Sequence, residues 1–355
     1  MFVKRIKQKE DRILKKREVN IECLRAIACI AVVILHVNAW CFEVEKMAGM
    51  MLVVNAIINT LVRFAVPCFM LITGKFVFQN ISKHGARGFY KRTIDKVIIP
   101  TFGFSIMYVL YTVLKGLLDD ELVLKEALHN LIKGIPFGHM WYMYMLIGFY
   151  LIAPLVGMIR EKLSNSAWGR VGIFCVLLGS VFYNGNLLAP CWLFCWIQYI
   201  GYFILGDFFW GGDKKNQLPS IILWIVNLTS LFIMCLYSLK VVSTGMRYDF
   251  QPQNFLTVIY SMSMFSIFNR MRIDKLPRVI EQVAKQSANI YYIHALVINI
   301  IIIIMNRLEV QYKFPVIFLL FTEVMVLIIS YVGGVCVDDI VLLLRNFSAS
   351  LGTHR

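Results

Sequence analysis

The stretch NIECLRAIACIAVVILHVNAW, residues 20–40, decides the fold. It is a long apolar run that can cross a bilayer as a helix, which takes about 20 residues, and it carries Arg25 and His36. At about 100° per residue, eleven positions make roughly three turns, so both side chains point from one face, about 16 Å apart along the axis. Ionisable groups inside a membrane usually face a protein interior or a water-filled cavity. Arg25 and His36 are therefore predicted to line one polar path through the membrane.

The rest of the chain has the same apolar character. It is 59% hydrophobic and 16% charged, with a mean hydropathy of +0.69, which is too apolar for a soluble domain of this size. We expect an all-α, polytopic membrane protein of about ten transmembrane helices. The predicted spans are 20–42, 50–74, 95–115, 140–159, 168–185, 187–209, 218–239, 253–269, 287–306 and 314–337.

Positive charge gathers on one side of these spans. With the N-terminus inside, 26 of the 36 Lys and Arg residues fall on inner segments and 8 on outer ones, which predicts that both termini are cytoplasmic. We therefore expect a basic cytoplasmic leader (1–19), one transmembrane domain (20–340) and a cytoplasmic tail (341–355). The net charge of +15 is then expected to attract anionic lipid headgroups at the membrane surface. No nucleic-acid partner is expected, because no basic soluble domain remains to bind one.

The first span resembles the opening helix of the acyltransferase 3 family of integral membrane acyltransferases, which also carries an Arg, ten residues and a His. The chain departs from the family pattern at two positions. Thr73 replaces a Ser before Gly74, which is mild because the hydroxyl is kept, and Lys96 stands where an Arg is common, which keeps the charge but loses the bidentate fork. Four further segments match in order: RFAVPCFMLITGKFVF (63–78), FYKRTIDKVIIP (89–100), GHMWYMYMLIGFYLIAPLV (138–156) and SANIYYIHALV (287–297).

The resemblance implies an O-acyltransferase of a bacterial-type cell membrane. It would take an acyl group, acetyl by expectation, from cytoplasmic acyl-CoA and deliver it to a hydroxyl of an extracytoplasmic glycan or other cell-envelope acceptor. Acyl-CoA is the only cofactor-like partner expected, with the lipid bilayer around the protein and a homo-oligomer left open. The scattered cysteines predict neither a disulfide framework nor a metal site.

The two residues of the first span are the predicted catalytic pair. His36 would deprotonate the acceptor hydroxyl, because imidazole titrates near neutral pH; transient acylation of His36 is the other route. The alternative for His36 is a structural hydrogen bond to a neighbouring helix. Arg25 would contact the donor or line its channel, and its alternative is snorkelling to the cytoplasmic interface beside Glu22.

Donor binding is assigned to four basic residues at the inner mouth: Arg87, Lys91, Arg92 and Lys96. Such a cluster suits the phosphates of coenzyme A, although the positive-inside bias alone would also put charge there.

Acceptor binding is assigned to residues of three later segments. Arg63 lies mid-membrane, with Glu323 in the last span as a candidate partner, and a structural ion pair is its alternative. His139 opens the fourth span beside interfacial aromatic residues. Tyr291 and His294 share a face near the inner end of the ninth span and are secondary candidates.

Transport is the alternative function to acyl transfer. The same kind of membrane domain occurs as a polysaccharide export protein and as the membrane half of vancomycin-resistance serine racemases, where it is linked to serine uptake. We expect no racemase domain here because the chain ends soon after the tenth span, but a chain trimmed to its membrane half would look the same. A purely structural scaffold is disfavoured, since a scaffold has little use for buried Arg and His.

Overall fold

The computed structural model describes residues 2–45, 49–118, 122–184, 192–211, 218–246, 248, 250–308 and 315–352, and within these ranges it contains helices and no strand. The all-α prediction is confirmed. The α-helices are α1 (Phe2–Glu45), α2 (Gly49–Leu61), α3 (Ala65–Thr93), α4 (Ile99–Leu118), α5 (Leu124–Ile132), α6 (Trp141–Lys162), α7 (Asn165–Asn184), α8 (Trp192–Cys195), α9 (Ile200–Gly211), α10 (Ser220–Val242), α11 (Phe255–Arg270), α12 (Arg278–Leu308) and α13 (Pro315–Gly352). Shorter helical turns join some of them: η1 (Ile94–Ile98), η2 (Gly138–Met140) and η3 (Trp196–Gln198).

Within the described residues the ten predicted spans are mostly helical. The span 50–74 covers parts of α2 and α3, and the span 187–209 covers α8, η3 and part of α9, with 187–191 outside the described residues. Among the described residues, seven helical stretches are long and apolar enough to cross a membrane, and the bent pair Trp192–Gln198 and Ile200–Phe209, which turns by 51°, raises the number to eight. The difference from ten arises because Gly49–Leu118 is one continuous candidate that covers two predicted spans, and because α11 has only 16 residues. The protein is a multi-pass membrane protein, and ten crossings remain a prediction.

Helix α13 shows the pattern of a span that faces lipid on one side. Apolar side chains are more than half exposed at every fourth position, at Leu320, Val324, Ile328 and Val332. The opposite face is closed, with Thr322, Val326 and Ser330 fully buried. Exposed apolar stripes of this kind suit hydrocarbon, whereas a water-soluble protein rarely shows them.

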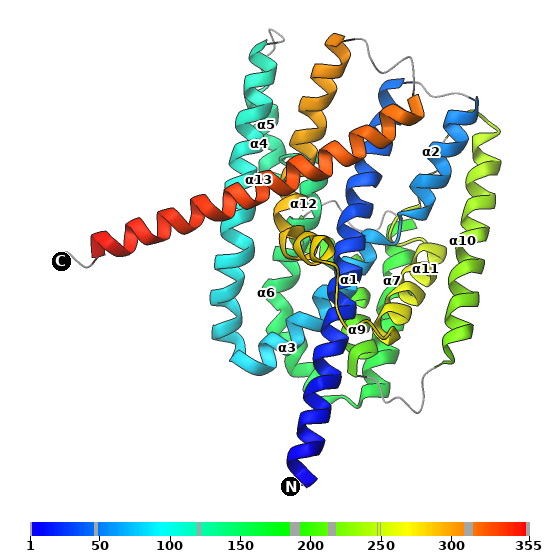
Figure 1. The fold of residues 1–355 in the computed structure, drawn as a ribbon, viewed down its shortest axis with the longest axis vertical. Helices are drawn as coiled ribbons and strands as arrows, with labels where there is room; N and C mark the ends of the chain where they lie inside the picture. The colour runs from blue at the N-terminus through cyan, green and yellow to red at the C-terminus, as the bar shows by residue number, and fades with distance from the viewer. Residues whose placement is uncertain are drawn as a thin grey trace. The chain divides into compact units, whose positions relative to one another are not determined.

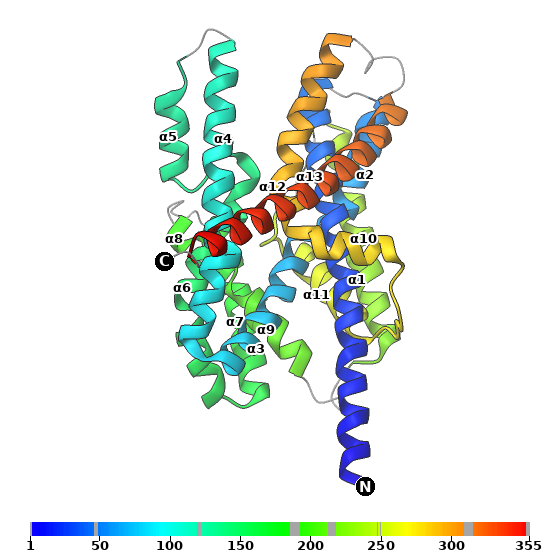
Figure 2. The same cartoon turned by 60° about the vertical axis from the view of Figure 1, so that its left-hand side comes forward.

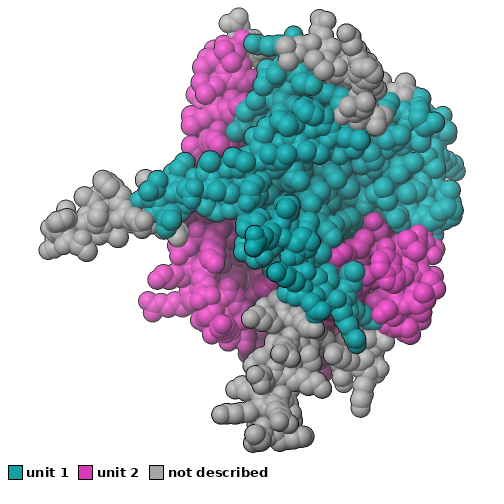
Figure 3. Space-filling model, in the orientation of Figure 1, with its two compact units in different colours: residues 1–65, 231–250, 270–355 teal, residues 66–230, 251–269 magenta. Residues whose placement is uncertain are grey.

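The chain divides into two compact units, coloured separately in Figure 3. Unit 1 comprises residues 1–65, 231–250 and 270–355, and unit 2 comprises residues 66–230 and 251–269. The predicted boundaries at 19 and 340 do not coincide with helix ends, since α1 and α13 run through them.

In unit 1, α1 packs against α2, α12 and α13, and α13 crosses α12 obliquely (Figures 1 and 2). The register of α1 against α12 is fixed by two contacts. The Cys29 thiol lies 3.9 Å from the Ser287 carbonyl oxygen, and seven residues further along each helix His36 meets His294. Equal advance along both helices means that α1 and α12 run in the same direction.

In unit 2, α3 packs on α9 through two glycines. A side chain at Gly74 would overlap the backbone of Phe203, and one at Gly206 would overlap the backbone of Leu71. Helix α3 then kinks at Gly85, whose φ of 66° favours glycine. Beyond the kink the chain lies against α6, where the Tyr90 hydroxyl donates to the Leu151 carbonyl oxygen at 2.7 Å.

Candidate functional site

The two predicted catalytic residues lie on one uninterrupted helix. Helix α1 is continuous from Phe2 to Glu45, so the predicted spacing of Arg25 and His36, about 16 Å along one face, holds in the structure. Both side chains are half-buried. A water-filled passage between them remains a prediction.

His36 contacts a second histidine, His294 of α12. The two ring centroids are 5.0 Å apart and the ring planes are tilted by 44°. His294 is fully buried, and its Nδ1 lies 2.7 Å from the Tyr291 carbonyl oxygen and 3.2 Å from that of Ile290. These carbonyls assign the proton to Nδ1, which leaves Nε2 as the basic nitrogen. The Tyr291 ring completes the cluster, 5.7 Å from His294.

This contact corrects the predicted depth of Tyr291 and His294. The ninth span was expected to begin at residue 287, which put both residues near its inner end. Helix α12 begins nine residues earlier, at Arg278, because the polar segment before the apolar run is helical too. Because α1 and α12 run parallel and His36 contacts His294, the two rings lie at one level along the two helices.

Arg63 joins the same cluster from the end of α2. Its Nε and one terminal nitrogen donate to the Asn59 side-chain oxygen at 2.8 and 2.5 Å, and Arg63 lies close enough to His36 to act on it electrostatically. Asn59 is almost completely buried. These hydrogen bonds give Arg63 a protein partner one turn earlier in the chain, and its mid-membrane position remains a prediction.

Glu323 belongs to a neighbouring network, not to the predicted pair with Arg63. Its carboxylate accepts a hydrogen bond from Asn38 at 2.9 Å. The Asn55 side chain in turn donates to the backbone and side-chain oxygens of Asn38 at 2.9 and 3.1 Å. This asparagine network, formed by Asn38, Asn55 and Glu323, joins α1, α2 and α13 two residues beyond His36.

Sequence reasoning missed Asn38, Asn55 and Asn59. For Asn55 and Asn59 a signal was present, since they and Arg63 recur every fourth residue in an apolar segment. That spacing puts all three on one face of a helix.

Arg25 pairs with Glu22 one turn earlier on α1. The nitrogen–oxygen distance is 2.8 Å, and the Arg25 side chain is 25% exposed. This ion pair is the partner expected for the snorkelling alternative, so the structure gives Arg25 a local electrostatic role beside any role in the donor path.

The predicted donor site lies in unit 2. Arg87, Lys91, Arg92 and Lys96, here called the basic arm, follow the Gly85 kink along the end of α3 and into η1, and all four are exposed. Arg92 reaches back to the Asn80 side chain at 3.5 Å. Exposed cations such as these are available to a soluble polyanion.

His139 also lies in unit 2, inside an aromatic cluster. It is 3% exposed, and its ring centroid is 5.1 Å from that of Tyr108 and 5.9 Å from that of Phe137. This packing gives His139 a place in the core of unit 2. Its role toward an acceptor remains a prediction.

The side chains of the cluster in unit 1 are of types that can transfer a proton. The cluster brings together His36, His294, Tyr291 and Arg63, which combine two imidazoles with a fixed positive charge. Within the described ranges no group of three or more His, Cys, Asp or Glu side chains is placed to hold a metal ion.

Proteins similar to this chain come from Staphylococcus aureus. Those of strains MSSA476, MW2 and Mu50 are each 22% identical over 317 residues, covering 83% of this chain and 87% of the relative, and each is named "Probable poly-beta-1,6-N-acetyl-D-glucosamine export protein". No solved structure gives a significant match. The family model described as "Acyltransferase domain" matches residues 18–335. Because this match covers nearly the whole chain, the protein belongs to the acyltransferase 3 family.

Proposed function

We propose that this protein transfers an acyl group, acetyl in the first instance, from cytoplasmic acyl-CoA to a hydroxyl of an extracytoplasmic glycan or another cell-envelope acceptor. The family indicates membrane acyltransferase activity in general. The donor, the acetyl group and the oxygen acceptor are our inference. The contact between His36 and His294 carries it, because acyl transfer to a hydroxyl requires a base at the reacting oxygen.

In this mechanism His36 is the general base. As the acceptor oxygen bonds to the thioester carbonyl carbon, its proton passes to His36, and the sulfur of CoA leaves and takes up a proton. The backbone carbonyl oxygens that accept a hydrogen bond from Nδ1 of His294 hold the His294 ring beside that of His36. The Arg63 guanidinium is a positive charge suited to the oxyanion that forms on the carbonyl oxygen.

The donor is proposed to arrive through the basic arm. Coenzyme A carries several phosphates, and exposed Arg and Lys side chains attract such anions before any close contact forms. Arg25 lies between the inner end of α1 and His36 and is assigned to the donor path. Tyr291 and His139 each keep the acceptor-binding role that the sequence assigns to them.

A second function is favoured by the names of the relatives. Proteins with 22% identity are named as probable exporters of a poly-N-acetylglucosamine, so export of such a glycan is the competing proposal for this chain. The two functions differ in one requirement. Acyl transfer consumes acyl-CoA and needs His36 as a base, whereas export moves the glycan without consuming a thioester.

Proteoliposomes with acetyl-CoA and a β-1,6-linked N-acetylglucosamine oligomer test both proposals. We expect CoA thiol release and acetylated oligomer from the wild type, with a loss of about 10²- to 10⁴-fold in His36→Ala. Lys162→Gln, which removes an exposed charge at the end of α6, is the matched control. Wild-type acetylation by His36→Ala would falsify the assignment. Oligomer movement across the vesicle membrane without thioester consumption would favour export.

A further inference from the structure

Unit 2 contains a cavity to which the proposed function assigns no residue. Its volume is about 420 Å³, and it lies between α3, α6 and α9. The α3 residues come just before the Gly85 kink, and the α6 residues come from the last two turns of that helix. The cavity is therefore at the end of the spans, on the side that the charge distribution assigns to the cytoplasm.

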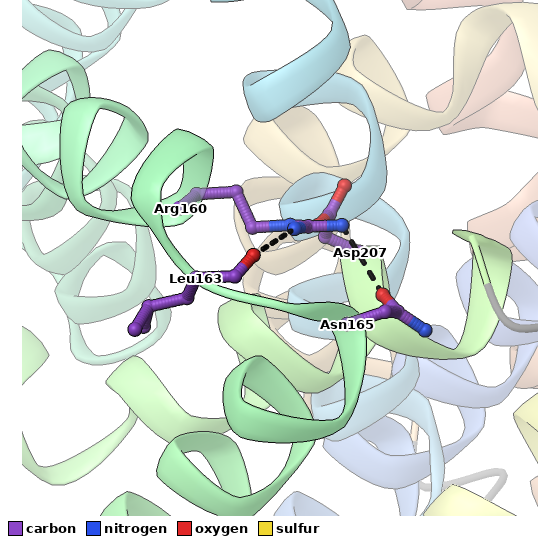
Figure 4. A network of polar contacts seen from close by, with 4 residues as sticks. All are labelled: Arg160, Leu163, Asn165 and Asp207. Atoms are coloured by element: carbon purple, nitrogen blue, oxygen red, sulfur yellow. Dashed lines mark hydrogen bonds and ion pairs between the residues drawn. The ribbon is translucent and has the colours of Figure 1, made fainter.

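Arg160 is the most firmly held side chain of this cavity (Figure 4). Its Nε donates to Asp207 at 2.7 Å and one terminal nitrogen donates to Asn165 at 3.1 Å. A third, longer contact of 3.5 Å reaches the Leu163 carbonyl oxygen. The guanidinium also lies 5.7 Å from the Trp168 ring. Anchored in this way, Arg160 loses little further freedom on binding a ligand.

The anchoring leaves Arg160 with hydrogen-bonding capacity. A guanidinium has five N–H donors, and the contacts within the described residues use three of them. Three residues with donor side chains line the same cavity, namely Gln79, Ser82 and Lys83. Arg, Lys and hydroxyl side chains are the groups that bind phosphate oxygens.

Acidic groups do not cancel this preference. Asp207 lines the cavity but is already engaged by Arg160. Glu161 is exposed at the rim, where water screens its charge. The partly buried charges of the cavity are therefore Arg160 and its ion-pair partner Asp207.

One wall of the cavity is apolar. Phe78 and Ile81 line it from α3, and Gly157 lines it from α6. The Ile81 side chain lies against Gly157. A ligand that fits both walls carries a phosphate on one end and an apolar or extended arm on the other.

We propose that this cavity binds the phosphate-bearing head of an amphiphilic molecule, with Arg160 and Lys83 as its phosphate ligands. Two sources share this chemistry: the phosphates of a CoA thioester and the headgroup of an anionic phospholipid. The inference does not depend on the proposed acyl transfer, because the cavity residues lie outside the histidine cluster and outside the basic arm.

Two binding measurements on delipidated, detergent-purified full-length protein separate these sources. The first is calorimetry with CoA, and the second is native mass spectrometry with phosphatidylglycerol against phosphatidylcholine. Each is made on the wild type, on Lys83→Gln, and on the double variant Arg160→Gln/Asp207→Asn, which replaces the ion pair by an amide pair. Lys83 is exposed, so Lys83→Gln keeps the test independent of folding. Lys162→Gln is the control for charge alone.

We expect at least one phosphate ligand to bind about tenfold more weakly to both cavity variants, and equally to wild type and Lys162→Gln. The inference is overturned if both ligands bind all four proteins alike, or if neither binds the wild type. If CoA binds and neither cavity variant weakens it, while phosphatidylglycerol does not bind through the cavity, the proposed acyl transfer is unaffected and the proposed phosphate cavity is rejected. If phosphatidylglycerol binds through the cavity and CoA does not bind at all, the phosphate cavity is supported and acyl transfer from CoA is not.

Discussion

The imidazole rings of His36 and His294 lie 5.0 Å apart although they come from the first and the twelfth α-helices of the chain. The contact is a consequence of parallel packing. Cys29 and Ser287 meet one heptad earlier on the same two helices, and seven residues bring each helix back to nearly the same face. Two imidazoles side by side can share a proton, which a single histidine cannot do. This pairing is the structural basis of the first prediction.

His294→Ala is expected to lower kcat for acetyl transfer by about 10- to 100-fold, because His36 loses the second imidazole with which it can share a proton. The double variant His36→Ala/His294→Ala should be no slower than His36→Ala alone, since residues that act as a unit are not additive. The measurement is CoA thiol release in proteoliposomes. Additive losses would contradict coupling between the two rings.

The variant His294→Asn separates this role from a purely structural one. An Asn amide can donate to the Tyr291 carbonyl as Nδ1 does, so the variant should keep the thermal stability of the wild type. It cannot exchange a proton, so its kcat should be as low as that of His294→Ala and its pH–rate profile should match that variant. Recovery of activity in His294→Asn would show that the hydrogen bond alone matters.

The asparagine network is expected to stabilise unit 1. Asn38→Ala removes the donor to Glu323 and the acceptor for Asn55, which should cost about 1–2 kcal/mol. Thermal unfolding followed by tryptophan fluorescence measures the loss. Asn299→Ala is the matched control, because Asn299 donates to its own helix at the Ala295 carbonyl oxygen. Equal shifts in the two variants would argue against a special role for Asn38.

Much of the candidate site was predictable because charge in an apolar span is rare. Arg25, His36 and Arg63 stand out for that reason alone, and the family resemblance added His294. The confirmed all-α fold and the mostly helical character of the predicted spans follow from long apolar runs, which only helices can satisfy in lipid.

The remaining features depend on contacts between helices that are far apart in the sequence, and no local sequence pattern identifies such contacts. Asn38 and Glu323 lie on the first and last helices, and nothing in either span identifies the other as its partner. The depth of His294 was misplaced because hydropathy locates the apolar run and not the polar helical turns before it. Two compact units were likewise not expected, since their segments alternate along the chain.

The glycines between α3 and α9 give a prediction about unit 2. Gly74→Ala and Gly206→Ala each force a methyl group into the backbone of the facing helix, which should destabilise the protein by about 1–3 kcal/mol. Gly103→Ala is the control, because a side chain at this position of α4 meets no atom within 4 Å. It should be neutral or slightly stabilising. Unfolding temperatures that fall equally in all three variants would refute close packing as the cause.

The basic arm is expected to act on donor binding through charge. Single substitutions of its members by Gln should raise KM for acetyl-CoA about two- to fivefold and leave kcat unchanged, because exposed charges contribute little each. The effect should shrink at high salt, which screens exposed charges. Lys240→Gln, at the end of α10 on the predicted outer side, removes the same charge and should leave KM unchanged. If the variant lacking all four charges keeps the wild-type KM at low salt, the donor does not enter through this arm. Assignment of the donor path would then shift to Arg25 and the cavity around Arg160.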